Sequence, residues 1–147
     1  MHNRIMNKLT AKRRAQVIAA LVEGNSIRAT VRMTGVARGT VLKLLADLGK
    51  ACQNYLDQTL RNLPCSRIQC DEIWSFCYAK EKNLPDELKG KLGFGDAWTW
   101  TAICAGTKLA AGWLVGERSA SFAQKFMQDL AARLAHRAQL TTDGYKA

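Results

Sequence analysis

Apolar residues repeat at helical spacing in the first third of the chain. Three segments show this pattern: residues 10–24, 26–33 and 40–49. Thr10 and Ser26 stand where N-caps are expected, and Gly24 follows the first segment, where a helix ends. The residues predicted to face inward are Val17, Ile18, Leu21, Val22, Ile27, Thr30, Val31, Met33, Val41, Leu44, Leu45 and Leu48. The pattern predicts an all-α module of three short helices.

The second and third predicted helices are joined by a short turn that contains Gly35, a residue suited to positive φ. Two amphipathic helices joined in this way form a helix-turn-helix, whose second helix enters the major groove of DNA. The residues expected to contact DNA are Arg28, Arg32, Arg38, Thr40 and Lys43. Ala37 occupies the cap position of the third helix, where Ser would be better by about 1 kcal/mol. The alternative is a three-helix bundle that binds protein.

From residue 67 onwards the hydrophobic period becomes that of strands. Strand patterns cover residues 67–80, 98–104 and 108–117, a helix follows at 119–137, and a further strand starts at 138. The helix carries its inner stripe at Phe122, Phe126, Leu130 and Leu134, with Ser119 or Ser121 as its cap. A helix that crosses between two strands returns the chain parallel to the sheet, so we expect the fourth strand beside the first. The order strand-strand-strand-helix-strand predicts part of an α/β domain.

Two adjacent carboxylates, Asp71 and Glu72, interrupt the first strand, which is apolar on both faces. Burying an unpaired carboxylate is costly, so packing alone does not account for them. Asp143 ends the fourth strand, and it would lie near Asp71 if the two strands are neighbours. Two carboxylates at one place repel each other unless a divalent cation lies between them, and Mg²⁺ suits such ligands. The alternatives are an ion pair of Asp71 with Arg67 or Lys80 and a turn-forming role for Asp143. Glu72 should point to the opposite face.

The chain of 147 residues has a net charge of +10, and the excess lies almost wholly in its first half. Residues 1–70 hold 12 Lys/Arg against 3 Asp/Glu, whereas residues 71–147 hold 10 against 9. This asymmetry favours an anionic partner for the first half, most simply nucleic acid. No apolar run is long enough to cross a membrane, and the N-terminus lacks the apolar core of a signal peptide. Five unevenly spaced cysteines favour a reducing cytosol, so we expect a cytoplasmic, DNA-associated protein.

The predicted organisation has three parts. Residues 1–49 form the helix-turn-helix domain, residues 50–66 a linker helix that ends at Pro64, and residues 67–147 the partial α/β domain. A long hairpin loop, residues 81–96, joins the first two strands. Its glycines follow no strand and open no helix, so a phosphate-binding loop is disfavoured. A zinc site built from Cys52, Cys65, Cys70 and Cys77 is a further alternative, although these cysteines lack the short paired spacing of structural zinc sites.

Several long motifs in the right order resemble insertion-sequence transposases, most closely the single-frame group related to insertion sequence one. They include "ALVEGNSIRATVRMTGVARGTVLKLLADLG", "RNLPCSRIQCDEIWSFCYAKEKN", "GDAWTWTAI", "FMQDLAARLA" and "QLTTDG". The resemblance implies a helix-turn-helix that binds terminal inverted repeats of double-stranded DNA. It also implies an RNase H-like domain of the Asp-Asp-Glu type that uses Mg²⁺ or Mn²⁺ in a homo-oligomeric assembly. The family's first two catalytic and metal-binding aspartates match Asp71 and Asp143.

The chain departs from the family pattern in three places. Cys104 stands where an acid is usual, Ala37 stands where Ser is usual, and the family's catalytic glutamate would follow Ala147. With no third carboxylate assigned, we expect this chain to be a truncated transposase without strand-transfer activity of its own. The alternative is a DNA-binding regulator that represses transposition without chemistry.

Overall fold

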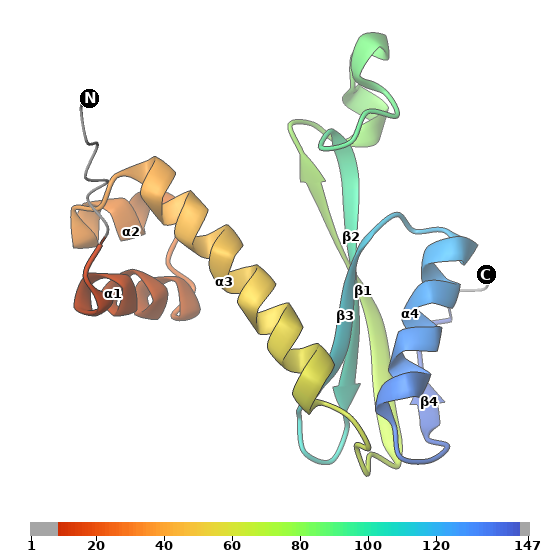
Figure 1. Ribbon diagram of the computed structural model, residues 1–147. Helices are drawn as coiled ribbons and strands as arrows, with labels where there is room; N and C mark the ends of the chain where they lie inside the picture. Colours follow the sequence, from red (N-terminus) through yellow and green to blue (C-terminus); the bar gives the residue numbers. More distant parts are fainter. Residues whose placement is uncertain (1–8, 145–147) are drawn as a thin grey trace, which may run out of the picture. The chain divides into compact units, whose positions relative to one another are not determined.

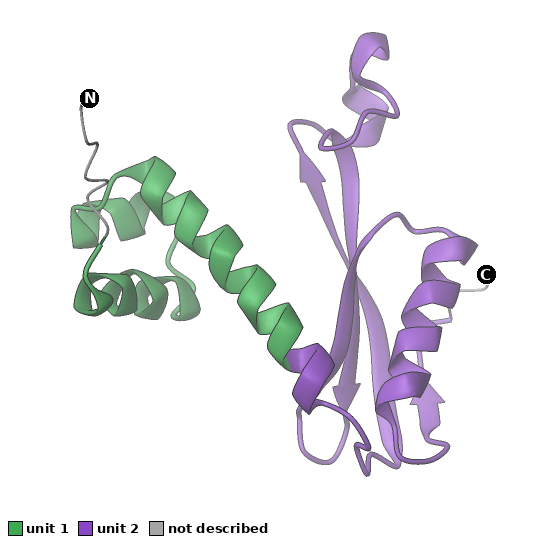
Figure 2. Cartoon of the chain, viewed as in Figure 1, with its two compact units in different colours: residues 1–55 green, residues 56–147 purple. Residues whose placement is uncertain are grey.

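The computed structural model describes residues 9–144 (Figure 1). These residues form a mixed α/β structure with four α-helices and one four-stranded sheet. The chain divides into two compact units, Met1–Tyr55 and Leu56–Ala147 (Figure 2). Within residues 9–144, no helix is both long enough and apolar enough to cross a membrane.

The first unit is built from α1 (Ala11–Val22), α2 (Ile27–Thr34) and most of α3 (Arg38–Thr59). The Thr10 and Ser26 hydroxyls accept hydrogen bonds from backbone N–H groups of the first turns of α1 and α2, as the sequence predicts. Gly35 ends α2 in the left-handed conformation, with φ of 65°. The core of this unit consists of Val17, Val36 and Val41, with Leu9, Leu21, Ile27, Val31 and Leu44 packed against it.

Two expectations for the first unit are wrong. The predicted third helix and the start of the predicted linker form a single helix, because α3 continues through Gly49 to Thr59. One glycine in a helix costs only about 1 kcal/mol, which is too little to end it. Val22, Met33 and Leu45 are exposed rather than inward-facing, because three short helices enclose only a narrow apolar stripe.

The second unit contains the sheet, with strand order β3-β2-β1-β4. Its elements are β1 (Arg67–Cys77), η1 (Glu81–Asn83), η2 (Asp86–Leu88), β2 (Gly95–Cys104), β3 (Ala110–Gly116), α4 (Ala120–Arg133) and β4 (Gln139–Thr141). Strand β2 pairs with β1 and with β3 in the antiparallel sense, and β4 lies beside β1 and parallel to it. The predicted order of elements and the predicted place of the fourth strand are therefore confirmed.

Helix α4 covers one face of this sheet (Figure 1). Its Phe126 and Leu130 pack into a core with Ile68, Trp100 and Ala102, and Phe122 and Leu134 join the same cluster. The opposite face carries exposed apolar side chains at Ile73, Ile103 and Val115. In the first half of β1 the side chains alternate between the face covered by α4 and the uncovered face, whereas its last five residues are all exposed, because β1 runs beyond the part of the sheet that α4 covers.

Candidate nucleic-acid interface and metal site

The pairing of β1 with β4 brings the chain segments of the two predicted aspartates next to each other. The parallel register aligns Arg67 with Gln139 and Gln69 with Thr141. Strand β4 ends at Thr141, and Asp143 lies two residues beyond it in a bend, so the prediction that the fourth strand extends to Asp143 is wrong. The two aspartates are therefore on neighbouring chain segments, Asp71 within β1 and Asp143 just after β4. Asp71 lies on the face opposite α4, and both residues are exposed.

The ion pair predicted as the alternative for Asp71 does not form within residues 9–144. Asp71 forms no ion pair there, and its Oδ1 accepts only the backbone N–H of Glu72, at 2.8 Å. At Asp143, the Thr142 hydroxyl accepts the N–H of Gly144, at 3.3 Å. An Asx-turn at Asp143 would involve residue 145, which lies outside the described residues, so that alternative stays a prediction. Asp71 is therefore the carboxylate whose side chain has no cationic partner among the described residues.

Thr101, which is not among the site residues predicted from the sequence, is a neighbour of Asp71. It is the register partner of Asp71 on β2, and its hydroxyl donates to the Asp71 carbonyl oxygen over 3.1 Å. Trp113 is in turn the partner of Thr101 on β3. The alternation of Thr99 and Thr101 along β2 was the available signal, since it marks a polar strip on the uncovered face.

Glu72 points to the face covered by α4, as strand alternation predicts. Its side chain is only 8% exposed and pairs with Arg118, whose Nη2 lies 3.1 Å from Oε2. Arg118 also lies over the Trp98 ring, 5.0 Å from its centroid. These contacts give Glu72 a structural role and leave Asp71 as the accessible carboxylate of the adjacent pair.

The donor set at Asp71 and Asp143 suits magnesium better than zinc. Mg²⁺ is commonly bound by one or two carboxylates and completes its shell with waters and substrate phosphates. Within the described residues, no group of three or more His, Cys, Asp or Glu side chains is placed to hold a metal ion. That finding covers the alternative four-cysteine zinc site as well: Cys52 and Cys77 are exposed, whereas Cys65 is buried.

The five residues predicted to contact DNA are all exposed on the first unit. Arg38 opens α3, and Thr40 and Lys43 follow on its first two turns, directly after the Gly35 turn. Lys43 forms a weak surface pair with Asp47 at 3.4 Å, so little energy holds it away from a phosphate. Between residues 9 and 55 the chain has eight Lys/Arg against two Asp/Glu, which gives this unit a positive surface.

Arg13 is a further cation near the turn and is not among the DNA contacts predicted from the sequence. Its Nη2 lies 3.7 Å from the position that a Cβ on Gly35 would take. Only the packing of α1 beside the turn brings this residue, distant in sequence, next to the start of α3.

No family model matches the chain, and no curated protein matches it. Among solved structures, it is similar to a chain in the "Crystal structure of the Mos1 Strand Transfer Complex", with 14% identity and a TM-score of 0.36. The similarity covers 95% of this chain and 53% of that chain, so this chain spans about half the length of the structure it matches. A likeness of this extent is too weak to define either fold or function.

Proposed function

We propose that this chain is a transposase-type protein that binds double-stranded DNA through its first unit. In the assembled enzyme, its second unit contributes to metal-dependent strand cleavage and transfer. The observation that supports the proposal is the parallel pairing of β1 with β4, which puts the strand that carries Asp71 beside the segment that leads to Asp143. The motif resemblance to insertion-sequence transposases points to the same two residues.

The DNA-binding part rests on the first unit. A turn with a left-handed glycine is followed by a helix whose first residues are exposed cations and a hydroxyl. Such a helix presents its N-terminal side chains to base edges and phosphates in the major groove. Terminal inverted repeats are the DNA class that the family resemblance implies.

The metal-binding part rests on Asp71 and Asp143, which would hold Mg²⁺ or Mn²⁺. Such an ion would stabilise the attacking and leaving oxygens of a phosphodiester displacement. Contacts within the chain hold Asp71 in position for this role. The Thr101 hydroxyl donates a hydrogen bond to the Asp71 backbone, and the ion pair with Arg118 holds Glu72 on the other face of the sheet. The uncovered face leaves room for a DNA strand beside the two carboxylates.

The DNA-binding part is tested by selecting preferred duplexes from a random pool with the full chain and measuring affinity against salt. We expect a steep loss of affinity with salt, because phosphate contacts release counterions. Arg38→Ala should relax the sequence preference. Lys12→Ala should weaken all sequences alike and lower the salt slope by about one. A chain without DNA affinity at low salt would refute this part.

The metal part is tested by measuring Mn²⁺ binding with electron paramagnetic resonance. This readout does not depend on enzymatic activity. Asp71→Asn and Asp143→Asn should each weaken Mn²⁺ binding at least about tenfold, whereas Asp86→Asn, an exposed control, should not change it. Duplex binding should be the same in all three variants. Equal Mn²⁺ binding by Asp71→Asn and the parent chain would remove the carboxylate pair from the proposal.

A second candidate function is a DNA-binding regulator without chemistry. The observation that favours it is that the first unit has a core of its own and holds nearly all of the excess charge. One measurement distinguishes the two candidate functions. Both would bind duplex DNA, but only the transposase-type protein would show Mn²⁺ binding that depends on Asp71.

A further inference from the structure

The distal half of the β1–β2 hairpin exposes a group of aromatic side chains. The group, called the aromatic strip below, comprises Trp74, Phe76, Tyr78, Phe94 and Trp98. Tyr78 is 72% exposed, Phe76 48%, Trp74 39% and Phe94 37%. Soluble proteins rarely expose aromatic residues side by side, so such a group marks a binding surface.

The rings of the strip contact one another along and across the hairpin. Trp74 and Trp98 are register partners on β1 and β2, and Trp74 and Phe76 have ring centroids 5.6 Å apart. Tyr78 and Phe94 meet edge to face at 5.8 Å. Tyr78 also has a positive φ of 68°, a conformation that bulky residues seldom adopt, and such outliers gather at functional positions.

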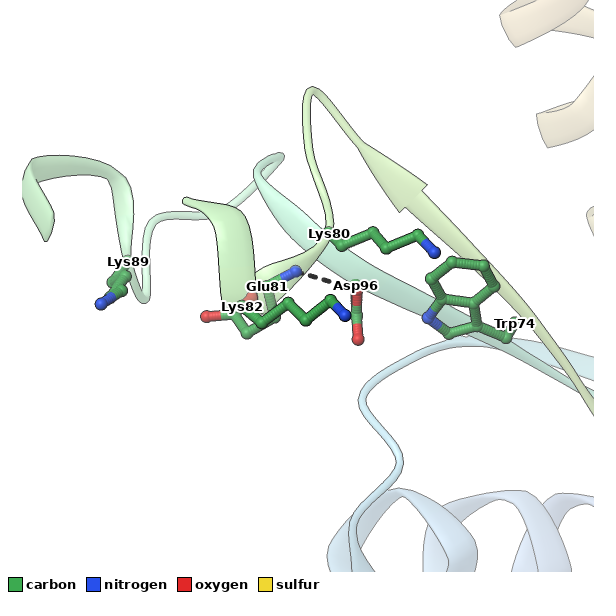
Figure 3. Close-up of a pocket in the computed structure, with 6 residues that line it drawn as sticks. All are labelled: Trp74, Lys80, Glu81, Lys82, Lys89 and Asp96. Atoms are coloured by element: carbon green, nitrogen blue, oxygen red, sulfur yellow. Dashed lines mark hydrogen bonds between the residues drawn. The ribbon is translucent and has the colours of Figure 1, made fainter. Parts of the chain in front are cut away.

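Cations accompany these rings. The Lys80 ammonium lies 4.9 Å from the centroid of Trp74, and the Arg118 guanidinium lies 5.0 Å from that of Trp98. Beside Trp74 is an open depression of ≈ 570 Å³, lined by Trp74, Lys80, Glu81, Lys82, Lys89 and Asp96. Figure 3 shows Lys80 reaching towards the Trp74 ring and Lys82 reaching towards Asp96, whereas Lys89 lies farther out.

The depression is lined by three lysines and two acidic residues, and one of the two carboxylates already accepts a hydrogen bond. Asp96 accepts the backbone N–H of Glu81 at 3.0 Å. Lys82 forms no ion pair within residues 9–144, and Lys80 has only the ring beneath it. The depression therefore combines flat apolar rings with ammonium groups that can form ion pairs with an anionic ligand.

We propose that the aromatic strip binds single-stranded or unpaired nucleotides. Their bases would stack on the exposed rings, and their phosphates would pair with Lys80 and Lys82. Stacking of bases on aromatic side chains beside a cationic groove is the usual way in which proteins hold single strands, and it needs no particular sequence. This goes beyond the proposed duplex binding and metal site, because neither uses the strip. A second copy of the chain is a less suitable occupant, since the surface combines apolar rings with exposed ammonium groups.

The test measures the affinity of the full chain for a fluorescent oligo(dT) strand and, separately, for a duplex of equal length. Trp74→Ala should weaken oligo(dT) binding about tenfold or more, within the range found for loss of one stacked base. Trp74→Phe should retain most of the affinity, and duplex affinity should not change. Val115→Ala, which removes an exposed apolar side chain elsewhere on the sheet, serves as the matched control.

Tyr78→Ala provides a second variant whose residue is too exposed to be required for folding, and it too should selectively weaken oligo(dT) binding. Unchanged oligo(dT) affinity in both variants, or equal loss for strand and duplex, would overturn the proposal. Sedimentation gives the remaining outcome. If the parent chain self-associates and Trp74→Ala is monomeric with unchanged oligo(dT) affinity, the strip is an interface between copies and the proposal is wrong. Failure of duplex binding or of Mn²⁺ binding would leave this test intact.

Discussion

Arg133 links the last turn of α3 to α4 within the second unit, and replacing it with alanine tests how much this link stabilises the fold. The residue is 5% exposed. Its Nε donates to Asp129 over 2.7 Å, its Nη1 donates to the Leu56 carbonyl oxygen over 3.1 Å, and its Nη2 donates to Asp57. Burial lowers the pKa of Arg133, but the hydrogen bonds and charges of Asp129 and Asp57 outweigh burial and raise it. The guanidinium therefore stays charged.

The magnitude of the loss follows from the exposure of the partners. Removing one member of a fully buried ion pair costs about 3–5 kcal/mol, because the other charge is left without a partner. Here the carboxylates of Asp57 and Asp129 are 42% and 41% exposed, so water can solvate them once Arg133 is gone. We therefore expect Arg133→Ala to lower the free energy of unfolding by about 2–3 kcal/mol, at or just below the lower limit of that range.

Tryptophan fluorescence is the appropriate assay, because all four tryptophans lie in the second unit. For a unit of this size, a loss of about 2–3 kcal/mol lowers Tm by roughly 10–20 °C. Lys89→Ala, which breaks the exposed pair with Asp86, is the control and should change stability by less than about 0.5 kcal/mol. A decrease in Tm no larger than that of Lys89→Ala would show that the Arg133 contacts contribute no net stability.

Three further predictions concern packing, capping and pH. Gly116→Ala should destabilise the second unit by about 1–3 kcal/mol in urea unfolding, since its Cβ would stand 1.9 Å from Phe122, whereas Gly106→Ala, with open space around it, should not. Ala37→Ser should stabilise the first unit by about 1 kcal/mol, measured by far-ultraviolet circular dichroism, because it supplies the missing cap of α3; no gain would place the cap elsewhere. Hydrogen bonds from Thr107 lower the pKa of Cys104 to about 7, so its contribution to stability is complete near pH 9 and is lost as the pH falls through 7. Burial and the neighbouring Cys104 raise the pKa of Cys65 to about 11, so the contribution of Cys65 is lost as the pH rises above 9. Stability should therefore be greatest near pH 9, and an unaltered pH profile in Cys104→Ala would contradict this.

Local pattern alone determined much of the element order. Thr10, Ser26 and Gly35 mark helix boundaries because they satisfy or end the backbone hydrogen bonding of a helix, and these interactions lie within a few residues. The stripe of α4 and the parallel return of β4 also followed from the sequence, because helical period and the handedness of crossover connections leave few alternatives. The separation of Asp71 from Glu72 needed only the alternation of a strand.

Tertiary structure decided which of these faces is covered. Periodicity shows that side chains share a face, but it does not show how far a covering helix reaches, so the exposure of Ile73 and of the aromatic strip could not be read from the sequence. The same limit applies to α3, where Gly49 looked like an end although the helix continues to Thr59. The register of β4 against β1, and the end of β4 at Thr141 before Asp143, depend on contacts between residues more than 70 positions apart. Local forces set each element, whereas the partners that meet across the sheet are chosen by burial of apolar surface over the whole unit.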